Sequence, residues 1–423
     1  MGLVNPEVID SEVVANIPIL FLVLCVVTGV GFLKELLTEV FLKVITVVKS
    51  KTQLSFLFCT LSALLSALLD ALTVTAVIAS VFFGLYGVYH RFASSAGAHH
   101  EHDSSLDDKV HEHHREDLEQ FRSFLRGLGM HAVVGTMLGG ILTMIGEPQN
   151  LVIADVMDWD FIEFIVVMAP VTVPVFLTGI AFSVVLEKLK WLDYGVELPE
   201  LVREVFDLEA QKRSENRTKR ESLTLWVQFW CVVLLIIMLV FHVSEIYLIG
   251  VTIAVLASTF IGRTSEHALV EAAEEGLPFF FVLLIFFGVV GMVHSQHLFA
   301  PVTDWIFSFE GTSRMLAYFT LTGFLSAVSD NVFVATLYIS EAQGFFADGK
   351  IGREEFEKIA VAINTGTNIP SISTPNGQAA FLFLLMSPLA KLIQLSYARM
   401  VYLAAPYAVV VTAVGAIAIS IQL

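Results

Sequence analysis

The chain has few charged residues and few cysteines for its length. Only 15% of its 423 residues are charged, while 56% are hydrophobic and the mean hydropathy is +0.76. A soluble domain of this size needs far more polar surface, so the composition indicates a lipid bilayer as the solvent. The cysteines Cys25, Cys59 and Cys231 lie within apolar segments. They therefore indicate neither a disulfide framework nor a metal-binding spacing.

Two other patterns are missing. The period-2 alternation of membrane β-barrel strands does not occur. The first apolar segment, 15–36, lacks a basic region before it and is long enough to span, so we expect no cleavable signal peptide. Segments able to cross roughly 30 Å of hydrocarbon instead recur from end to end. The sequence predicts an all-α polytopic membrane protein.

Uninterrupted apolar segments predict the membrane-spanning helices, at 15–36, 160–187, 222–243, 245–262, 277–296 and 400–422. The amphipathic segments 37–51 and 297–310 are too charged or too short to span, and we expect them along the membrane interface. Other apolar segments are interrupted by polar, glycine or proline residues. These are 53–89 (interrupted at 66–75), 127–158 (at 146–150), 313–346 (at 326–331) and 357–390 (at 364–378).

The interrupted segments form an internal repeat. The string from Ser66 to Asp70 aligns with that from Ser326 to Asp330. Each is followed by a Gly-Thr pair (135–136 and 366–367) and then by a proline with neighbouring amides (148–150 and 375–378). This alignment makes Thr374 the counterpart of Glu147. Discontinuous helices in corresponding halves of a chain mark the binding site of many transporters.

The basic residues predict how the chain crosses the membrane. If 53–89 and 313–346 are re-entrant hairpins, the loops 37–52, 90–126, 188–221, 263–276 and 391–399 share one face. That face, counted from Lys34, carries 20 of the 24 Lys and Arg residues, so it is predicted to be cytoplasmic. The two halves are then inverted. If each hairpin instead crosses the membrane twice, the same loops fall on the same face, so the charge count does not separate the two options. Hairpin helices of about 15–18 residues are marginal for spanning, which favours re-entrance.

Asp70 and Asp330 are the principal candidate site residues. A carboxylate deep in the membrane costs several kcal/mol unless it is compensated, so such a residue is by default a functional hypothesis. The alternative is a buried ion pair, or a protonated acid that packs two helices. No Lys or Arg lies close in sequence within a predicted span, and the two acids occupy matching repeat positions. We therefore favour a functional role.

Oxygen-bearing side chains surround both acids and suit a small hard cation, whereas soft Cys or Met donors are absent from the breaks. A single Ser or Thr more often forms a hydrogen bond with its own helix backbone than with a ligand. Only the occurrence of such residues at all four interruptions favours an ion site. The candidate ion-binding residues are Asp70, Asp330, Glu147, Asn331, Asn150, Asn376, Thr73, Ser66, Ser326, Thr374, Thr367 and Asn364.

These acids suggest a mechanism for exchange. A buried carboxylate that faces two solutions in turn can bind either a proton or a cation. Sodium entry then expels the proton, and protonation on the other side releases sodium. We assign this competition to Asp70 and Asp330, with Glu147 as a third acid that tunes it.

The loop 90–126 is rich in histidine, which suggests a metal-binding segment or a pH sensor. No fixed ligand spacing stands out, so a solvated low-complexity loop is the favoured interpretation. His131, at the start of the first broken helix, is a weaker candidate for a pH sensor. A simple packing role is favoured for it.

The chain resembles the NhaB family of bacterial sodium/proton antiporters. The resemblance is carried by the strings 69–75, 146–151, 329–334, 364–368 and 374–381. It implies sodium extrusion in exchange for protons at a Gram-negative inner membrane, with Na⁺, or alternatively Li⁺, and H⁺ as transported ions, no cofactor and no nucleic-acid partner. A homodimer through the scaffold helices is a further expectation.

The resemblance also implies a division into two parts. A transport core would comprise 53–158 and 313–390, and would move like an elevator against a scaffold of 1–52, 160–312 and 391–423. The large basic loops would be cytoplasmic and the C-terminus periplasmic. The first half has fewer spans before its hairpin than the second, so the chain is expected to be N-terminally short relative to the family.

Other functions stay open at this stage. A sodium-coupled carboxylate carrier on the same scaffold would need positive groups at the hairpin tips, where acids stand instead. An inactive truncated paralogue or a membrane receptor would conduct no exchange. An intramembrane enzyme is least favoured, because no nucleophile and histidine share a span.

Overall fold

The computed structural model describes residues 10, 13–14, 17–94, 103–273, 276–296 and 300–423, and these residues form helices without a strand. The fold class predicted from composition is therefore confirmed. In chain order the helices are α2 (Ile17–Gly31), α3 (Lys34–Val47), α4 (Lys51–Leu69), α5 (Ala71–Ala93), η1 (Asp107–Lys109), η2 (Glu112–His114), α6 (Arg115–Gly140), α7 (Pro148–Met157), α8 (Phe161–Leu189), α9 (Glu200–Asn216), α10 (Lys219–Val240), α11 (Ile246–Ile261), α12 (Glu266–Ala273), α13 (Gly276–Ser295), α14 (Ala300–Phe307), α15 (Thr312–Val328), α16 (Asn331–Ala347), α17 (Arg353–Asn368), η3 (Pro370–Ser373), η4 (Pro375–Gly377), α18 (Ala379–Met386), α19 (Pro388–Leu392) and α20 (Tyr397–Gln422).

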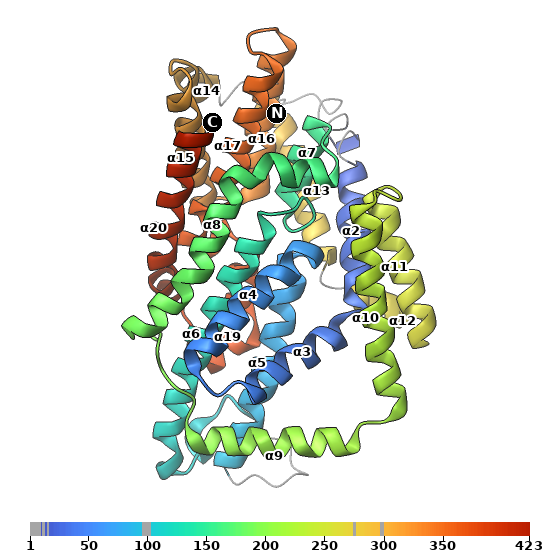
Figure 1. Ribbon diagram of the computed structural model, residues 1–423, viewed down its shortest axis with the longest axis vertical. Helices are drawn as coiled ribbons and strands as arrows, with labels where there is room; N and C mark the ends of the chain where they lie inside the picture. The colour runs from blue at the N-terminus through green and yellow to red at the C-terminus, as the bar shows by residue number, and fades with distance from the viewer. Residues whose placement is uncertain (1–9, 11–12, 15–16, 95–102, 274–275, 297–299) are drawn as a thin grey trace, which may run out of the picture.

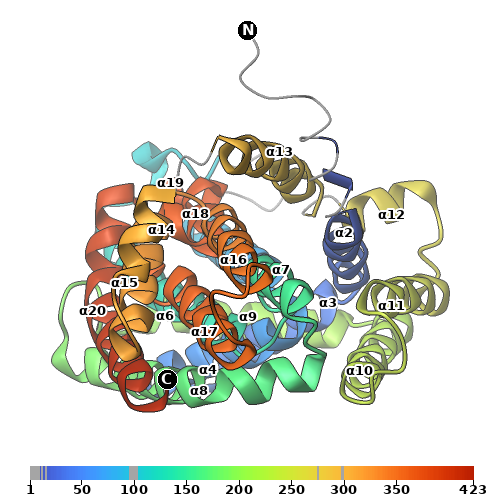
Figure 2. The same cartoon turned by 90° about the horizontal axis from the view of Figure 1, so that it is seen from above.

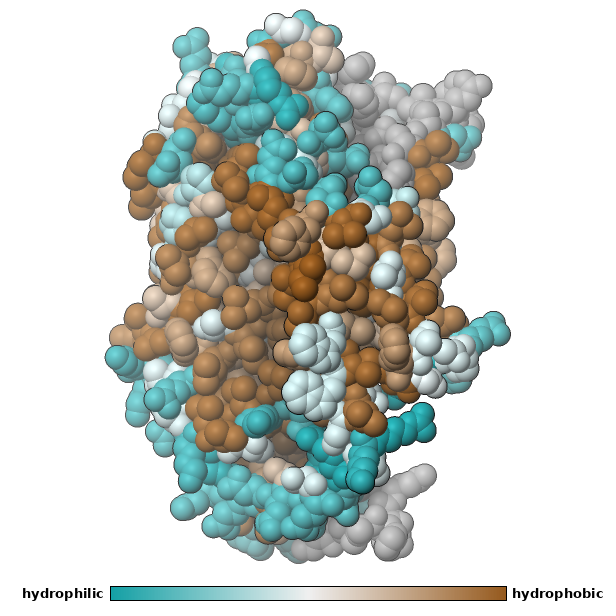
Figure 3. All heavy atoms as spheres, turned by 45° about the vertical axis from the view of Figure 1, so that its right-hand side comes forward, coloured by the Kyte–Doolittle hydropathy of each residue, from teal (hydrophilic) through white to brown (hydrophobic). Residues whose placement is uncertain are grey.

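A band of apolar side chains lies between two polar ends of the molecule, as the face in Figure 3 shows. Five helices of the described residues, α4, α5, α8, α10 and α20, are long and apolar enough to cross a membrane, and α11 is apolar but shorter. Because helices satisfy their own backbone hydrogen bonds, they can expose such a band to lipid. The spans predicted at 160–187, 222–243 and 400–422 correspond to α8, α10 and α20.

Two of the predicted interruptions are the tips of helical hairpins. α4 and α5 pack together and are separated by Asp70 alone. α15 and α16 also pack together, and Ser329 and Asp330 separate them. The arms of the second hairpin have 17 residues each, as expected, but those of the first have 19 and 23.

The other two interruptions divide long helices. α6 ends at Gly140, and α7 begins at Pro148, a residue suited to the first turn because it has no N–H to satisfy. α17 ends at Asn368, and η3 and η4 lead to α18, which begins at Ala379. Both helices are therefore broken as predicted, but the first break begins at Ile141, five residues before the predicted start at 146, and the second begins after Asn368 rather than at Asn364.

The two broken helices run in opposite directions. Arg126, in the first half of α6, donates a hydrogen bond to the Ile393 carbonyl just beyond α19, at 2.7 Å. Arg353, the first residue of α17, donates one to the Met157 carbonyl at the end of α7, at 2.6 Å. The first half of each broken helix thus lies beside the end of the other.

Each hairpin opens toward the start of the broken helix that follows it. Lys51, the first residue of α4, reaches the Phe124 carbonyl in α6 at 3.5 Å. Arg314, near the start of α15, pairs with Glu355 in the first turn of α17. The two hairpins therefore enter from opposite ends, and Figure 1 shows α4 and α5 below α15 and α16.

Small residues let each hairpin pack closely on its broken helix. A Cβ at Gly135 would lie 2.3 Å from the Cys59 carbonyl oxygen, and one at Gly366 would lie 2.7 Å from that of Phe319. Cys59 and Phe319 stand the same number of residues before Asp70 and Asp330. The two halves thus make corresponding backbone contacts at the matched glycines.

The remaining helices surround these elements. Seen from above in Figure 2, α7, α16 and α17 lie centrally, α15 and α20 on one side, and α2, α10 and α11 on the other. α8 packs on α4 and α20, and α2 packs on α11. α9 crosses one end of the molecule below α5 (Figure 1). The short helices α3 and α14 fall in the segments expected at the interface, although 297–299 lie outside the described residues.

The histidine-rich loop is shorter than predicted. α5 continues to Ala93, and α6 begins at Arg115 rather than near residue 127, so only 94–114 remains outside these two helices. The charged residues of 115–126 suggested a solvated loop, but Arg122 and Arg126 are buried and paired with acids. Residues 95–102 lie outside the described part of the chain.

Candidate ion site

Both hairpin tips place an aspartate at the N-cap of the second helix. Asp70 Oδ1 accepts from the Thr73 backbone N–H at 2.9 Å, and Oδ2 accepts from the Thr73 hydroxyl at 2.7 Å. Asp330 Oδ1 accepts from the N–H groups of Val332 and Phe333 at 2.8 and 3.2 Å. An aspartate cap has a structural use of its own, because it satisfies free N–H groups in the first turn.

The two tips differ in backbone conformation. Asp70 has φ 115° and ψ 152°, a region that residues other than glycine rarely adopt, whereas Asp330 has φ −79°. Strained backbone of this kind persists where the surrounding structure enforces it, and it is frequent at functional sites. Asp70 is buried and Asp330 is half-buried.

Each broken helix is bonded to the tip of its own hairpin by a threonine. Thr143 Oγ1 donates to the Ala67 carbonyl at 2.5 Å. Thr374 Oγ1 donates to the Ala327 carbonyl. Ala67 and Ala327 are matched residues of the aligned hairpin strings. Thr143 and Thr374 are therefore structural counterparts.

This pairing corrects the correspondence between Glu147 and Thr374 that was expected from the neighbouring prolines. Glu147 follows Thr143 by the same spacing as Gln378 follows Thr374. Glu147 is the N-cap residue of α7, with φ −146°, and Gln378 is that of α18, with φ −140°. Gln378, which carries the amide in place of the carboxylate, is thus the counterpart of Glu147 in the other half.

The breaks in the two crossing helices meet each other. Gln149 Nε2 donates to Asn368 Oδ1 at 2.6 Å, and Asn368 Nδ2 contacts Asn150 Oδ1 at 3.2 Å. Asn150 also donates to the carbonyls of Gly140 and Thr143 at the end of α6, at 2.7 and 2.8 Å. Asn150 therefore holds the end of α6 and connects the two halves.

Several buried oxygens around the breaks have no hydrogen-bond partner among the described residues. They include the hydroxyls of Ser66 and Ser326, one carboxylate oxygen of Glu147, and the amide oxygens of Gln378 and Asn364. An unsatisfied buried polar atom costs about 1–3 kcal/mol, so such atoms need an explanation. Ser66 and Ser326 are matched positions, as are Glu147 and Gln378, so both halves offer free oxygens of the kind that hard cations prefer.

The three acids share one electrostatic environment. The charges of Asp70 and Asp330 both act on Glu147, which is 2% exposed. No group of three His, Cys, Asp or Glu side chains has metal-binding spacing in the part of the chain that the structure describes. A cation here would therefore be bound by few carboxylates, together with hydroxyl, amide and carbonyl oxygens.

The other predicted site residues have varied surroundings. Thr73 bonds to Asp70 through its hydroxyl, whereas Thr367 bonds to the carbonyls of its own helix at 3.0 Å, the structural alternative weighed from the sequence. Asn331 is buried at the second tip, and its side-chain nitrogen lacks a partner among the described residues. Asn376 differs from the rest because it is exposed on η4.

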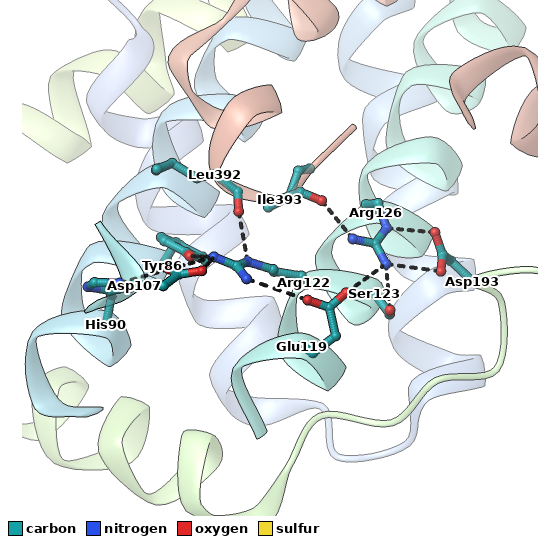
Figure 4. A network of polar contacts seen from close by, with 10 residues as sticks. All are labelled: Tyr86, His90, Asp107, Glu119, Arg122, Ser123, Arg126, Asp193, Leu392 and Ile393. Atoms are coloured by element: carbon teal, nitrogen blue, oxygen red, sulfur yellow. Dashed lines mark hydrogen bonds and ion pairs between the residues drawn. The ribbon is translucent and has the colours of Figure 1, made fainter. Parts of the chain in front are cut away.

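Sequence reasoning missed a pair of buried arginines on α6, shown in Figure 4. Arg122 Nη2 contacts both Asp107 carboxylate oxygens, at 2.8 and 2.9 Å, and also the Tyr86 hydroxyl at 2.7 Å. Arg126 Nε contacts Asp193 Oδ2 at 2.7 Å. Spacing of four residues on one helix face was the available signal, with Glu119 on the same helix 3.4 Å from Arg122 and 3.7 Å from Arg126, but Asp107 and Asp193 are more distant in sequence.

The described histidines of the loop do not form a metal site. His111, His113 and His114 lie close together, with ring centroids 5.6 and 4.0 Å apart along the series, but they form no group with metal-binding spacing. Partial burial and the neighbouring His113 imidazole lower the pKa of His114. This shift moves the titration of His114 away from neutral pH, which disfavours a role as a sensor there.

Comparison with known proteins identifies close relatives. Residues 1–423 match the family described as bacterial Na⁺/H⁺ antiporter B (NhaB). The Na⁺/H⁺ antiporter NhaB of Pseudoalteromonas atlantica is 49% identical over 98% of this chain and 79% of its own length. That of Marinobacter nauticus is 48% identical over 98% and 83%, and that of Hahella chejuensis is 48% identical over 100% and 85%.

Two solved transporter structures are also similar in outline. The Alcanivorax borkumensis YdaH transporter has a TM-score of 0.49 at 13% identity, covering 98% of this chain and 86% of its own. The Neisseria gonorrhoeae efflux pump MtrF has a TM-score of 0.47 at 13% identity, covering 95% and 80%.

Proposed function

This chain belongs to the NhaB family of bacterial Na⁺/H⁺ antiporters, and we propose that Asp70, Asp330 and Glu147 carry its exchange. The protein is a secondary transporter of the bacterial inner membrane that exchanges Na⁺ for H⁺ and needs no cofactor. The proposal concerns the residues, the moving parts and the sidedness of that exchange.

The proposed mechanism is competition at buried carboxylates. Asp70 and Asp330 each bind Na⁺ when ionised and a proton when Na⁺ leaves, and Glu147 shifts this balance through its charge. The free oxygens of Ser66, Ser326 and Asn364 complete the coordination together with carbonyls at the ends of α4, α6, α15 and α17. Asn331, Thr73, Thr374, Thr367, Asn150 and Asn376 belong to the surrounding shell that shapes these ends.

One observation supports this proposal above the others. Matched aspartates stand at the N-caps of both hairpin tips, and Glu147 is buried in the break between α6 and α7, beside the first tip, where the Ala71 N–H donates to the Gly146 carbonyl at 3.3 Å. A purely structural cap needs no third acid nearby, because like charges at a buried site repel one another. A bound cation or proton would relieve that repulsion.

We further propose that the residues 53–158 and 313–390 form a transport core that moves against the scaffold of 1–52, 160–312 and 391–423. Corresponding glycine and threonine contacts, and the opposite direction of the two broken helices, support an inverted repeat. An inverted repeat provides two conformations of similar energy, in which the site opens to either side.

The charge distribution gives the proposed sidedness. The start of α4 at Lys51, and the first half of α6, which carries Arg126, lie near α9 and the basic loops, so we assign this end to the cytoplasm. The turn after α16 and the C-terminus then face the periplasm. Scaffold helices such as α10, with Trp226 and Trp230 exposed, offer the surface for a homodimer.

Exchange in everted vesicles from antiporter-deficient cells tests the assignment. Asp70→Asn and Asp330→Asn keep the shape of the cap but remove the charge, so we expect Na⁺-dependent proton movement to fall to background in each variant. Asp348→Asn, at an exposed position beyond α16, is the matched control and should exchange normally.

The outcomes separate the alternatives. Normal exchange by both tip variants would contradict the proposed site. Na⁺-dependent uptake of labelled succinate by the wild type would instead favour a carboxylate carrier. Absence of any Na⁺-dependent pH change in wild-type vesicles, with the protein present in the membrane, would favour an inactive paralogue.

A further inference from the structure

A second group of buried ionisable side chains lies between the proposed core and scaffold. We call Lys51, Ser55, His131, Glu187 and Tyr407 the Glu187 cluster. Its three ionisable members Lys51, His131 and Glu187 are 7%, 0% and 2% exposed. Ser55 precedes Asp70 on the same hairpin by 15 residues, which at 1.5 Å per residue puts the cluster roughly 20 Å from the tip. The cluster is therefore separate from the candidate ion site.

The carboxylate of Glu187 is the centre of this cluster. Its Oε1 accepts from the Ser55 hydroxyl at 2.8 Å, contacts His131 Nε2 at 2.8 Å, and lies 3.6 Å from Lys51 Nζ. Its Oε2 accepts from the Gly195 backbone N–H at 2.8 Å. An ionised carboxylate accepts only, so these donors match a charged Glu187.

Both ring nitrogens of His131 are engaged. Nδ1 lies 2.6 Å from the Tyr407 hydroxyl, while Nε2 faces Glu187. A neutral imidazole with its proton on Nε2 donates to Glu187 and accepts from Tyr407, so every bond in the chain has one donor and one acceptor. With Glu187 negative and Lys51 positive, the buried set then carries no net charge.

The cluster connects parts that must separate if the core moves. Ser55 comes from α4 and His131 from α6, both in the proposed core, whereas Lys51, the first residue of α4, lies at the end of the scaffold segment 1–52. Glu187 comes from α8 and Tyr407 from α20, both in the proposed scaffold. The hydrogen bonds of Ser55 and His131 to Glu187, and that between His131 and Tyr407, would break when the core slides, and Glu187 would lose two of its partners while it stays buried.

The fold itself does not require this cluster. Four residues before the matched glycines Gly135 and Gly366 stand His131 and Ala362. Counting back equally from Asp70 and Asp330 pairs Ser55 with Met315. Apolar side chains therefore fill the corresponding positions of the second half, and the ionisable set is a feature of one half alone.

A cavity adjoins the cluster at one end of the molecule. A cavity of about 290 Å³ is lined by Lys51, Phe124, Glu197 and Arg203 at the end proposed to be cytoplasmic. The other ionisable groups that face the cluster are Asp193, which pairs with Arg126 at 2.7 Å, Tyr194, whose hydroxyl donates to the Leu403 carbonyl, and the thiol of Cys59. None of these supplies an uncompensated charge.

We propose that the Glu187 cluster is a second proton-binding site, reached through this cavity, that holds the core to the scaffold while it is unprotonated. This inference rests on the proposed division into core and scaffold. It assigns to Glu187 and His131 a control of movement, distinct from the ion exchange at Asp70 and Asp330.

The sign of the effect follows from the hydrogen bonds. A proton on His131 Nδ1 removes the acceptor of the Tyr407 hydroxyl and leaves a net positive charge in a buried site. A proton on Glu187 leaves Lys51 uncompensated and removes an acceptor from Ser55 or His131. Either proton weakens the contact, which is therefore complete at alkaline pH and lost as the pH falls.

Glu187→Gln tests this inference, because the amide copies the size of a protonated carboxyl. Exchange is measured in vesicles from acid to alkaline pH for the variant, for wild type and for Glu163→Gln, an exposed acid on the same helix. We expect the ratio of Glu187→Gln to wild-type rate to rise toward alkaline pH, by about tenfold or more. The Glu163→Gln ratio should stay constant.

Ser55→Ala and Asp330→Asn complete the design. Ser55→Ala removes one hydrogen bond and no charge, so it should shift the ratio in the same direction by less, and it serves if Glu187→Gln does not accumulate in the membrane. A ratio that is flat across pH overturns the inference. If Asp330→Asn exchanges normally, the proposed ion site fails instead, whatever the Glu187 variant shows.

Discussion

Asp70 and Asp330 form the same kind of helix cap on different backbones. Both accept backbone N–H groups of the following helix, but Asp70 has φ 115° and Asp330 has φ −79°. A non-glycine residue in the former conformation stores about 1–3 kcal/mol of strain. Replacing an N-cap residue by glycine lowers the free energy of unfolding by only a few tenths of a kcal/mol. The two positions should therefore respond differently to the same substitution.

We predict that Asp70→Gly leaves the thermal unfolding midpoint in detergent equal to or above that of wild type, because glycine relieves the strained backbone. Asp330→Gly should lower the midpoint, because it loses the cap and adds backbone freedom. Both variants should lose exchange. A fall of the midpoint in Asp70→Gly as large as that in Asp330→Gly would show that the backbone at Asp70 is not strained.

The sequence located the residues of the tips but not the buried ion pairs. Asp70 and Asp330 stand out because no other charge lies near them in an apolar segment. Glu187 is 56 residues from His131 and 132 from Ser55, and each lies near the end of its own apolar segment, where a polar residue is ordinary. Only the packing of α4, α6 and α8 brings them together, and no local pattern reports that packing.

Helix interruptions were predictable because proline, glycine and amide residues cannot continue an apolar helix without cost. The start of α6 was not, since charged residues at 115–126 are typical of a solvated loop. Asp107 and Asp193 bury Arg122 and Arg126 by pairing with them. The sequence alignment of the repeat agrees with the close contacts of Gly135 and Gly366, but not with the contacts of Thr374. The proline neighbours do not keep the spacing that Thr143 and Glu147 share with Thr374 and Gln378.

At the level of helix packing, we predict that Gly135→Ala destabilises the protein by about 1–3 kcal/mol through overpacking. The added Cβ would lie 2.3 Å from the Cys59 carbonyl oxygen in α4, and neither backbone can yield easily. Thermal unfolding in detergent measures the effect.

Gly344→Ala is the matched control for this prediction. Gly344 lies in α16 and a Cβ there meets nothing within 4 Å. Alanine favours a helix over glycine by up to about 1 kcal/mol, so this variant should unfold at the same or a higher temperature. Equal midpoints for the two variants would contradict the close packing of α4 on α6.

On the scale of the whole molecule, the apolar band and the asymmetric charge define two faces. We predict that a cysteine at Ser214, on α9, reacts with an impermeant maleimide only from the cytoplasmic side. A cysteine at Asp348, beyond α16, should react only from the periplasmic side. Both are exposed, and the substitutions are made after Cys25, Cys59 and Cys231 have been replaced. Reaction of both from one side would rule out the proposed topology.

The most direct test of the central claim is proton release by the purified protein. Added Na⁺ should displace protons from Asp70 and Asp330, so a weakly buffered solution of the wild type should acidify with a saturable dependence on Na⁺. The variant carrying both Asp70→Asn and Asp330→Asn should release none, while Asp348→Asn should match the wild type. Equal proton release by the double variant and the wild type would contradict competition at these aspartates.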